Sequence, residues 1–291
     1  MKKLNKVVIP VAGLGIRMLP ATKEVPKEML PVAGKPIIHH IVNEAIESGF
    51  SEIIFVSHKS KESVENYFLK NPKLELILEK KFQESLLDEI KNISNLGTKI
   101  VSILQDKPKG LGHAILCAKT LIAGEPFGVM LPDMILDYRR KKNSFAKMKK
   151  NFEEVGESSI LLGKVKKSEV QNYGIAKFNK RDKKNRFFSL DDIVEKPEPK
   201  KAPSNLFAVG RYIFENEILS FLGKEKPDRS GEIQLTGAIS NFLKSSKTLK
   251  GCLVEGDFYD CGNMIGYLIA NLNFSIKDPT TKKEVFKLLK K

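Results

Sequence analysis

Short apolar runs separated by charged segments of helical period make up the first half of the chain. The runs at residues 7–11, 52–57, 99–104 and 127–131 are rich in β-branched side chains, which predicts buried parallel strands. Amphipathic stretches at residues 35–48, 62–69, 74–93 and 114–122 lie between them and predict helices. Strands that alternate with helices predict a mostly parallel, Rossmann-like sheet with right-handed crossovers.

The pattern changes after about residue 152. Residues 159–165, 173–178, 187–195 and 206–214 resemble strands separated by charged turns, and residues 180–185 resemble the tip of a hairpin. Two further helices are expected near residues 233–243 and 264–276. The fold class predicted is therefore α/β, a mixed sheet flanked by helices with an antiparallel lobe. We expect one domain over residues 1–291, divided into lobes at about 1–152 and 153–275 and a basic tail at 276–291.

Composition indicates a folded protein of the cytoplasm. The 291 residues are 41% hydrophobic, enough to bury a core, and no apolar run approaches the roughly 20 residues of a membrane span. Residues 1–6 lack the apolar region of a signal peptide. The three cysteines are odd in number, which favours reduced thiols over a disulfide framework. We expect no membrane partner.

The net charge of +15 raises the alternative of nucleic-acid binding. The basic residues, however, lie mostly in runs typical of a surface, such as residues 139–142, 180–184 and 282–291. No aromatic stacking pattern, helix-turn-helix or zinc motif accompanies them in the sequence. A lysine-rich solvated surface that also attracts anionic substrates is the better interpretation, and no nucleic-acid partner is expected.

The turn after the first strand combines small residues with cations. Ala12, Gly13 and Gly15 allow close approach of a ligand to the backbone, and Arg17 and Lys27 follow within a few residues. Backbone N–H groups and positive charge both favour anions, so this turn predicts a polyphosphate site. It lacks the third glycine of the dinucleotide motif and the lysine of the P-loop. Taken alone, the glycine pair also fits a simple strand-to-helix connection.

Two further motifs suggest nucleotide and metal binding. Gln105 precedes Gly110, and its amide suits the donors and acceptors of a uracil, although a glycine-rich helix entry with a surface glutamine is the alternative. Asp133 ends the fourth strand, and Asp260 stands at an apparent strand end far along the chain. Together these acids are candidates for Mg²⁺, or else for turn and N-cap roles. Asp137 is expected in a loop.

The segment Val194-Glu195-Lys196-Pro197 lies at a predicted strand end. A glutamate accepts hydrogen bonds from sugar hydroxyls and a lysine holds a phosphate, although a surface ion pair is the simpler reading of four residues. Gly174 and Gly210 lie inside predicted strands, which marks a bulge or a place where a ligand approaches.

The string GLGIRMLPATK, followed by PKEMLPV and KP, resembles the N-terminal signature of the nucleotidyltransferases that join a nucleoside triphosphate to a sugar 1-phosphate. The PKEMLP version is similar to their uridylyltransferase branch, and the similarity extends from residue 7 to about residue 270. It implies a first lobe that binds the nucleotide and a second that binds the sugar phosphate. It also implies Mg²⁺ as the cofactor, and homodimers or homotetramers.

The resemblance also assigns residues. It implies nucleotide contacts by Ala12, Gly13, Gly15, Gln105 and Gly110, and catalytic roles for Arg17 and Lys27 on the triphosphate, with Lys27 stabilising the transition state. It implies Mg²⁺ ligation by Asp133 and Asp260, and glucose 1-phosphate contacts by Gly174, Glu195, Lys196, Val209 and Gly210.

The implied reaction is attack of glucose 1-phosphate on the α-phosphorus of UTP, which gives UDP-glucose and pyrophosphate. Use of dTTP or ATP by a related enzyme is the nearest alternative, and a catalytically silent regulatory relative is a second. Two positions depart from the family pattern: Gly237 stands where an aspartate is usual, and His39-His40 where Gln-Tyr is usual.

Overall fold

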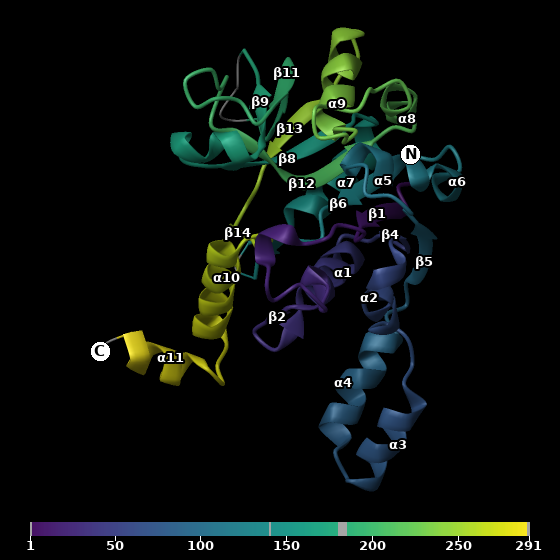
Figure 1. Cartoon of the computed structure of the whole chain (residues 1–291), viewed down its shortest axis with the longest axis vertical. Helices are drawn as coiled ribbons and strands as arrows, with labels where there is room; N and C mark the ends of the chain where they lie inside the picture. The colour runs from purple at the N-terminus through teal and green to yellow at the C-terminus, as the bar shows by residue number, and fades with distance from the viewer. Residues whose placement is uncertain (1, 140, 180–184, 290–291) are drawn as a thin grey trace.

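A ten-stranded mixed sheet runs through the computed structural model, which describes residues 2–139, 141–179 and 185–289 (Figure 1). Eight strands follow the order β10-β13-β8-β12-β6-β1-β4-β5, with β9 and β11 attached through β12. Their bounds are β1 (Lys6–Pro10), β4 (Glu52–Ser57), β5 (Lys99–Leu104), β6 (Phe127–Met130), β8 (Ser159–Lys164), β9 (Gly174–Lys177), β10 (Phe187–Ser189), β11 (Asp192–Glu195), β12 (Leu206–Phe214) and β13 (Lys250–Leu253).

The sheet joins a parallel part to a largely antiparallel part. Strands β6, β1, β4 and β5 are parallel neighbours, as the alternating pattern predicted. Strand β12 runs antiparallel to β6, β8 and β9, whereas β13 is parallel to β8. The predicted α/β mixed sheet is therefore correct. Because strands from both halves share one sheet, the boundary between lobes at about residue 152 stays a prediction.

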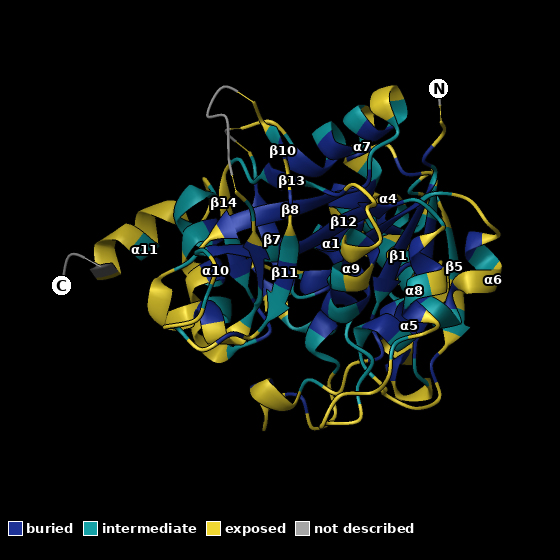
Figure 2. Cartoon of the chain, turned by 90° about the horizontal axis from the view of Figure 1, so that it is seen from above, coloured by how far each residue is buried: buried dark blue, intermediate teal, exposed yellow. Residues whose placement is uncertain are grey.

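Side chains of the central strands alternate between two cores. In β1, Val7 and Ile9 pack into one core and Val8 into the other. Helices α1 (Ile37–Glu47) and α7 (Ser144–Val155) cover the first face, and α5 (Leu111–Cys117), α6 (Lys119–Ile122), α8 (Ile218–Leu222) and α9 (Leu235–Lys244) cover the second. Figure 2 shows the central strands as buried. Strands covered on both faces are apolar throughout, which explains the continuous runs in the sequence.

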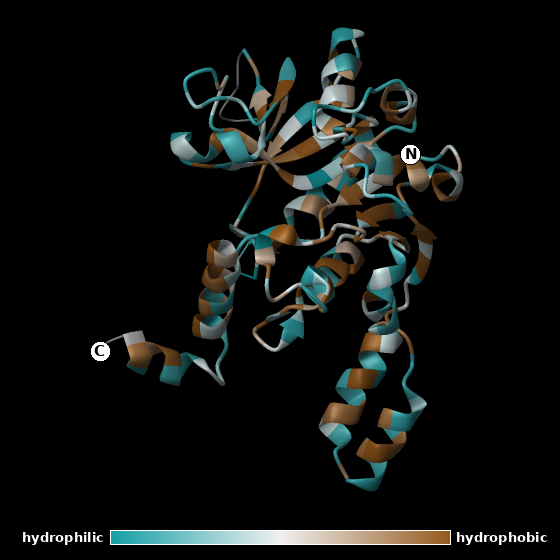
Figure 3. Ribbon diagram, in the orientation of Figure 1, coloured by the Kyte–Doolittle hydropathy of each residue, from teal (hydrophilic) through white to brown (hydrophobic). Residues whose placement is uncertain are grey.

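The single helix predicted over residues 74–93 is wrong. This segment forms a helical hairpin, α3 (Pro72–Lys80) and α4 (Glu84–Ser94), which follows α2 (Glu62–Asn66) and projects from the body of the protein (Figures 1 and 3). Phe82, at φ 54°, lies in the left-handed region and turns the chain between the helices. Both helices are amphipathic, so the charged and apolar spacing continues across the turn and hides it.

Two other predictions are corrected. The strand expected over residues 187–195 is two strands, because β10 pairs with β13 and β11 pairs with β9. Asp137 is not in a loop but ends β7 (Met134–Asp137), a strand paired antiparallel with β14 (Asp257–Asp260). Arg139 and Lys277 both donate to its carboxylate and, although burial opposes them, hold its pKa well below the usual range. The hairpin tip predicted at 180–185 lies almost wholly outside the described residues.

The remaining elements are a small β2–β3 ribbon (Pro31–Val32 and Lys35–Pro36) and the C-terminal helices α10 (Met264–Lys277) and α11 (Lys282–Leu289). Cys117, Cys252 and Cys261 are free thiols. Within the described part of the chain, none of the helices combines the length and apolar character needed to cross a bilayer.

His39 on α1 predicts a loss of stability in acid. The residue is 7% exposed, Asn43 Nδ2 donates to Nε2 at 2.9 Å, and Nδ1 lies 3.1 Å from the Tyr67 hydroxyl. This arrangement suits a neutral imidazole. Burial, with nearby Lys35, lowers the pKa of His39 to about 4. The unfolded chain binds this proton near pH 6.5 and the folded chain does not, so stability falls as the pH drops from 6.5 to 4, by roughly 3 kcal/mol.

Denaturant unfolding of wild type and His39→Gln at pH 7 and pH 4.5 tests this expectation. The variant, which has no ring to protonate, is expected to lose less stability between the two pH values. An identical loss in both proteins would assign the acid sensitivity to other groups.

Candidate functional site

The predicted site residues of the parallel strands gather at one edge of the sheet. Ala12 and Gly13 follow β1, Gln105 follows β5, and Asp133 comes shortly after β6. Since these strands are parallel neighbours, their carboxyl ends meet at the same edge, where open α/β sheets bind ligands.

Local turns aim the cations of the first loop at this edge. Gly15 adopts φ 70° and precedes a 3₁₀ turn, Ile16–Met18, and its carbonyl accepts a hydrogen bond from Thr22 Oγ1 at 2.8 Å. A second 3₁₀ turn, Lys27–Met29, carries Lys27 back toward β6. The positive φ favours glycine at this position, and a Cβ there would make a tight contact of 3.3 Å with Lys27 Cβ.

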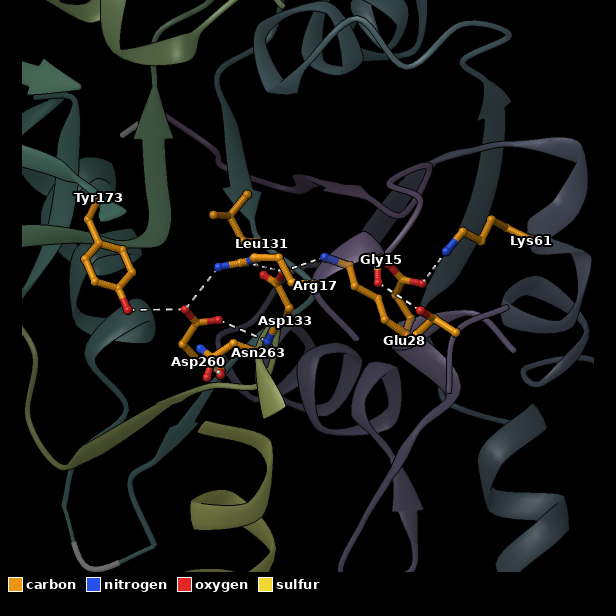
Figure 4. Close-up of polar contacts among 12 residues, drawn as sticks. Gly15, Arg17, Glu28, Lys61, Leu131, Asp133, Tyr173, Asp260 and Asn263 are labelled. Carbon is orange, nitrogen blue, oxygen red and sulfur yellow. Dashed lines mark hydrogen bonds and ion pairs between the residues drawn. The ribbon is translucent and has the colours of Figure 1, made fainter. Parts of the chain in front are cut away.

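Arg17, Lys27, Asp133 and Asp260 form what we call the carboxylate cluster (Figure 4). Lys27 Nζ lies 2.5 Å from Asp133 Oδ2. The Arg17 guanidinium, which is 58% exposed, lies 3.7 Å from Asp260 Oδ2 and 4.0 Å from Asp133 Oδ2. The structure thus brings together four residues that are as much as 243 positions apart, Arg17 and Asp260 at the extremes.

Burial and charge fix the protonation of this cluster. Burial acts to raise the pKa of Asp133, but Lys27 and then Arg17 outweigh it and lower that pKa below its usual value. Burial likewise acts to lower the pKa of Lys27, but Asp133 and Glu28 raise it. Both groups are therefore charged at neutral pH. Behind Lys27, the buried Glu28 accepts a hydrogen bond from Lys61 Nζ at 2.9 Å.

Asp260 is held by its own loop and by a tyrosine. The hydroxyl of Tyr173 donates to Asp260 Oδ2 at 3.2 Å (Figure 4). The Gly262 backbone N–H donates to Oδ1 at 3.0 Å. Pairing of β14 with β7 brings this loop next to Asp133, since Asp260 is opposite Met134 in the ladder.

A buried ion pair supports the loop that carries Asp133. The fully buried Arg211 donates two hydrogen bonds to the Glu44 carboxylate, from Nε at 2.9 Å and from Nη2 at 2.6 Å. The same guanidinium donates to the carbonyls of Leu131 (3.2 Å) and Met134 (2.7 Å), which flank Asp133. Arg211 is therefore a positioning residue for Asp133.

The residues predicted for the sugar phosphate are brought together only in part. Glu195 lies opposite Gly174 in the β11–β9 ladder, and Thr236 donates to Glu195 Oε2 at 3.0 Å. Lys196, 56% exposed, lies 3.5 Å from Glu195 Oε1. Val209 is fully buried in the core, and a Cβ at Gly210 would lie 2.8 Å from Leu131, so packing accounts for both positions.

Gln105 and Gly110 lie together near the nucleotide edge. Gln105, 4% exposed, donates from Nε2 to His113 Nδ1 at 2.8 Å and to the Gly110 carbonyl at 3.3 Å. A Cβ at Gly110 would lie 2.8 Å from Glu232 Cβ, so the absence of a side chain at Gly110 allows the segment at Glu232 to pack closely against it. At Gly13, in contrast, a Cβ would meet nothing within 4 Å, which leaves that backbone open to a ligand.

The two acids fit a cation that prefers oxygen ligands. A Cβ built on Gly262 would lie 2.7 Å from Asp133 Oδ2 and 3.0 Å from Asp260 Oδ1, so both carboxylates border the small space that this glycine leaves. No group of three or more His, Cys, Asp or Glu side chains suited to a metal occurs among the residues that the structure describes. Two carboxylates agree with Mg²⁺, which keeps waters and binds substrate phosphates.

Comparison with known proteins identifies the family. A model described as "Nucleotidyl transferase" matches residues 6–275. The chain belongs to the nucleotidyl transferase family. The UTP–glucose-1-phosphate uridylyltransferase of Escherichia coli K12 is 42% identical over 97% of this chain and 94% of its own length.

Solved structures agree with this nucleotidyl transferase fold. A UTP-bound UGPase from Acinetobacter baumannii superposes with a TM-score of 0.90 at 38% identity, covering 98% of both chains. A UDP-glucose pyrophosphorylase complexed with UDP-glucose superposes with a TM-score of 0.85 at 34% identity, covering 94% of this chain and all of that one. The predicted family and fold class are confirmed.

Sequence reasoning missed several residues of this nucleotidyl transferase site. Tyr173 and Thr236 contact Asp260 and Glu195 through single hydroxyl groups, which leave no periodic signal. Gly262 was a detectable candidate, since it follows Asp260 by two positions. Glu225 was also missed. Its Oε2 lies 2.5 Å from where a Cβ at Gly237 would stand, so a carboxylate from another segment lies beside the position where the family usually has an aspartate.

Gly262→Ala is expected to reduce turnover sharply while the protein stays folded. Its Cβ would lie within 3.0 Å of both carboxylates and 2.6 Å from Arg17 Nη2, so the cluster must spread. Displacement of reacting groups by about 1 Å costs on the order of 10²-fold in rate. Gly223→Ala, whose Cβ would meet its nearest neighbour at an ordinary 3.4 Å, is the matched control. Initial rates and melting temperatures check this, and equal rates for the two variants would contradict it.

Proposed function

We infer that this nucleotidyl transferase transfers UMP from UTP to α-D-glucose 1-phosphate, giving UDP-glucose and pyrophosphate. The observation that carries this conclusion is the carboxylate cluster, two cations and two acids converging at the carboxyl edge of a parallel sheet. Nearly the whole chain matches relatives named UTP–glucose-1-phosphate uridylyltransferase.

The reaction requires positioning of two anions. A phosphate oxygen of glucose 1-phosphate forms a bond to the α-phosphorus of UTP, and the bond from that phosphorus to the bridging oxygen of pyrophosphate breaks. The attacking phosphate has a second pKa of about 6 and is largely a dianion at neutral pH, so the reaction needs no general base. Arg17 and the protonated Lys27 neutralise the triphosphate, and Lys27 stabilises the charge that develops in the transition state.

Mg²⁺ is the proposed cofactor, with Asp133 and Asp260 as its ligands. The ionised state of Asp133 and the position of both carboxylates around Gly262 support this assignment. When bound, the ion supplies charge neutralisation and orientation of phosphate oxygens.

The remaining residues are proposed to select the substrates. Ala12, Gly13, Gly15, Gln105 and Gly110 lie on the loops of the nucleotide edge, and the open backbone at Gly13 supports close approach of the nucleotide there. Gly174, Glu195, Lys196, Val209 and Gly210 are proposed for glucose 1-phosphate. The contact of Tyr173 with Asp260 supports the nearness of Gly174 and Glu195 to the cluster, because Tyr173 directly precedes Gly174, which pairs with Glu195. Val209 is fully buried, so it and Gly210 are proposed to contribute backbone groups only.

We also propose that the protein is a cytoplasmic homodimer or homotetramer. Helix α10 supports assembly, since it exposes an apolar stripe at helical spacing formed by Ile265, Leu268, Ile269 and Leu272. The free thiols agree with a reducing compartment. Light scattering after size exclusion is expected to give two or four chains per particle, and a monomer would contradict the assembly.

Pyrophosphate release tests the reaction. Purified protein is supplied with glucose 1-phosphate, Mg²⁺ and, in parallel, UTP, dTTP, ATP, CTP or GTP. We expect a strong preference for UTP that EDTA abolishes. Preference for dTTP or ATP would keep the fold and mechanism but overturn the nucleotide assignment. No pyrophosphate release with any nucleotide would favour a catalytically silent regulatory relative.

A further inference from the structure

A basic cavity of about 920 Å³ lies apart from the carboxylate cluster. Four segments line it: the loop after β7, one face of α7, the start of β10 and the loop before β14. Glu154 and Glu255 are its acidic residues, and Asn151 and Phe187 complete the lining. Its cationic side chains are three times as numerous as the acidic ones: Arg139, Lys141, Lys142, Lys147, Lys150 and Arg186.

The internal ion pairs leave positive charge unbalanced. Glu255 is shared by Lys147 and Arg186, which hold its pKa below the usual value. Arg139 is bound to Asp137, and Lys150 Nζ lies 3.8 Å from Glu154 Oε1. Lys141 and Lys142 have no ion-pair partner among the residues for which the structure gives positions. Like charges gathered in a concave site repel one another, and a bound anion relieves that repulsion.

The shape of the cavity favours a small ligand. Residues 147, 150, 151 and 154 recur at helical spacing on α7, so their side chains share one face. Together with Arg186 and the residues of the loop after β7, they line an open depression whose volume is within the range of about 300–1,000 Å³ typical of small-molecule sites. Several lysines and arginines on a concave wall suit the oxygens of phosphate groups, which accept charge-assisted hydrogen bonds.

The β7–β14 ribbon connects this cavity to the carboxylate cluster. At one end, Met134 pairs with Asp260, directly after Asp133. At the other end, Asp137 pairs with Asp257, and the chain continues on both sides into the cavity lining at Arg139 and Glu255. The ribbon is four residues long, or about 13 Å.

Lys277 links the two strands at the end of the ribbon nearest the cavity. Its Nζ lies 2.7 Å from Asp137 Oδ2 and 3.1 Å from Asp257 Oδ2, one contact to each strand. A ligand that pulls on Arg139 or Glu255 therefore acts on two strands, of which β14 ends with Asp260 and β7 begins directly after Asp133.

We propose that the basic cavity is a second anion site, which binds a small molecule carrying two or more phosphate groups. The site does not overlap the substrates of the proposed reaction, and its occupation is coupled to the carboxylate cluster through the β7–β14 ribbon.

Isothermal titration with inorganic tripolyphosphate tests this site, without Mg²⁺ and in an Arg17→Gln/Lys27→Met background that removes both cations of the carboxylate cluster. We expect one tripolyphosphate per chain. Lys142→Glu/Lys150→Glu, which reverses two exposed charges in different segments of the lining, is expected to weaken binding about tenfold or more. Lys73→Glu/Lys80→Glu on α3 makes the same change of charge at two other exposed positions and is expected to leave binding unchanged.

Equal weakening in both double variants, or no saturable binding by the Arg17→Gln/Lys27→Met protein itself, would overturn the proposal. The protein can also be tested for binding to vesicles of anionic phospholipid and to single-stranded DNA. If wild type binds either of these, Lys142→Glu/Lys150→Glu does not, and tripolyphosphate shows no saturable binding, the cavity binds a macromolecule and the proposal is overturned. A titration of UDP-glucose alone reports on the proposed reaction site and separates its failure from failure of the anion site.

Discussion

Lys27→Met is expected to lower kcat by about 10²–10³-fold, the usual cost of removing one preorganised group that stabilises transition-state charge. Methionine keeps an unbranched side chain as far as Cε and removes the ammonium group, so the loss reports mainly on charge. Lys27 Nζ lies 2.5 Å from Asp133 Oδ2 and is the strongest influence that lowers the pKa of that acid. Its removal is expected to raise the pKa of Asp133, so activity in the variant fails at a higher pH than in wild type.

Initial rates across pH, with circular dichroism to confirm folding, measure both effects. Lys80→Met, which removes one exposed cation on α3, is the control and is expected to match wild type. A folded Lys27→Met protein with a near-normal rate would refute the assigned role.

Arg211→Met is expected to reduce the free energy of unfolding by about 3–5 kcal/mol, because it leaves the Glu44 carboxylate buried without its partner. Both members of this pair are buried, at 0% and 2% side-chain exposure. The variant also loses the donors to the Leu131 and Met134 carbonyls, so the loop that holds Asp133 is expected to move. Activity should then need more Mg²⁺ for half-saturation.

The double variant Glu44→Leu/Arg211→Met separates the two effects. Replacing a buried ion pair by apolar residues is often neutral, so most of the stability lost in Arg211→Met is expected to return. The loop still lacks its donors, so the increased Mg²⁺ requirement is expected to remain. Recovery of both properties together would show that Arg211 stabilises the fold without positioning Asp133.

Local patterns were sufficient where one property of the chain decides the structure. The apolar run at β1 predicts a buried strand, because a strand covered on both faces needs apolar residues at every position. The small residues and cations that follow it predict anion binding for a similarly local reason. A turn within a continuous amphipathic pattern carries no such signal, which is why the α3–α4 hairpin escaped prediction.

By itself the sequence determined the α/β class and the family resemblance, and it predicted Arg17, Lys27, Asp133 and Asp260 as site residues, since strand periodicity and motif chemistry are local. Only the tertiary structure decided how these residues meet. The β7–β14 ladder sets Asp260 beside Asp133, and the buried Arg211–Glu44 pair supports the loop that carries Asp133. Gathering the basic cavity also required folding, because its lining comes from four segments of the chain. Contacts between distant segments depend on which strands pair, in which register, and on which side chains are buried together. These contacts produce no repeating pattern of residues, so they cannot be predicted from the sequence in this way.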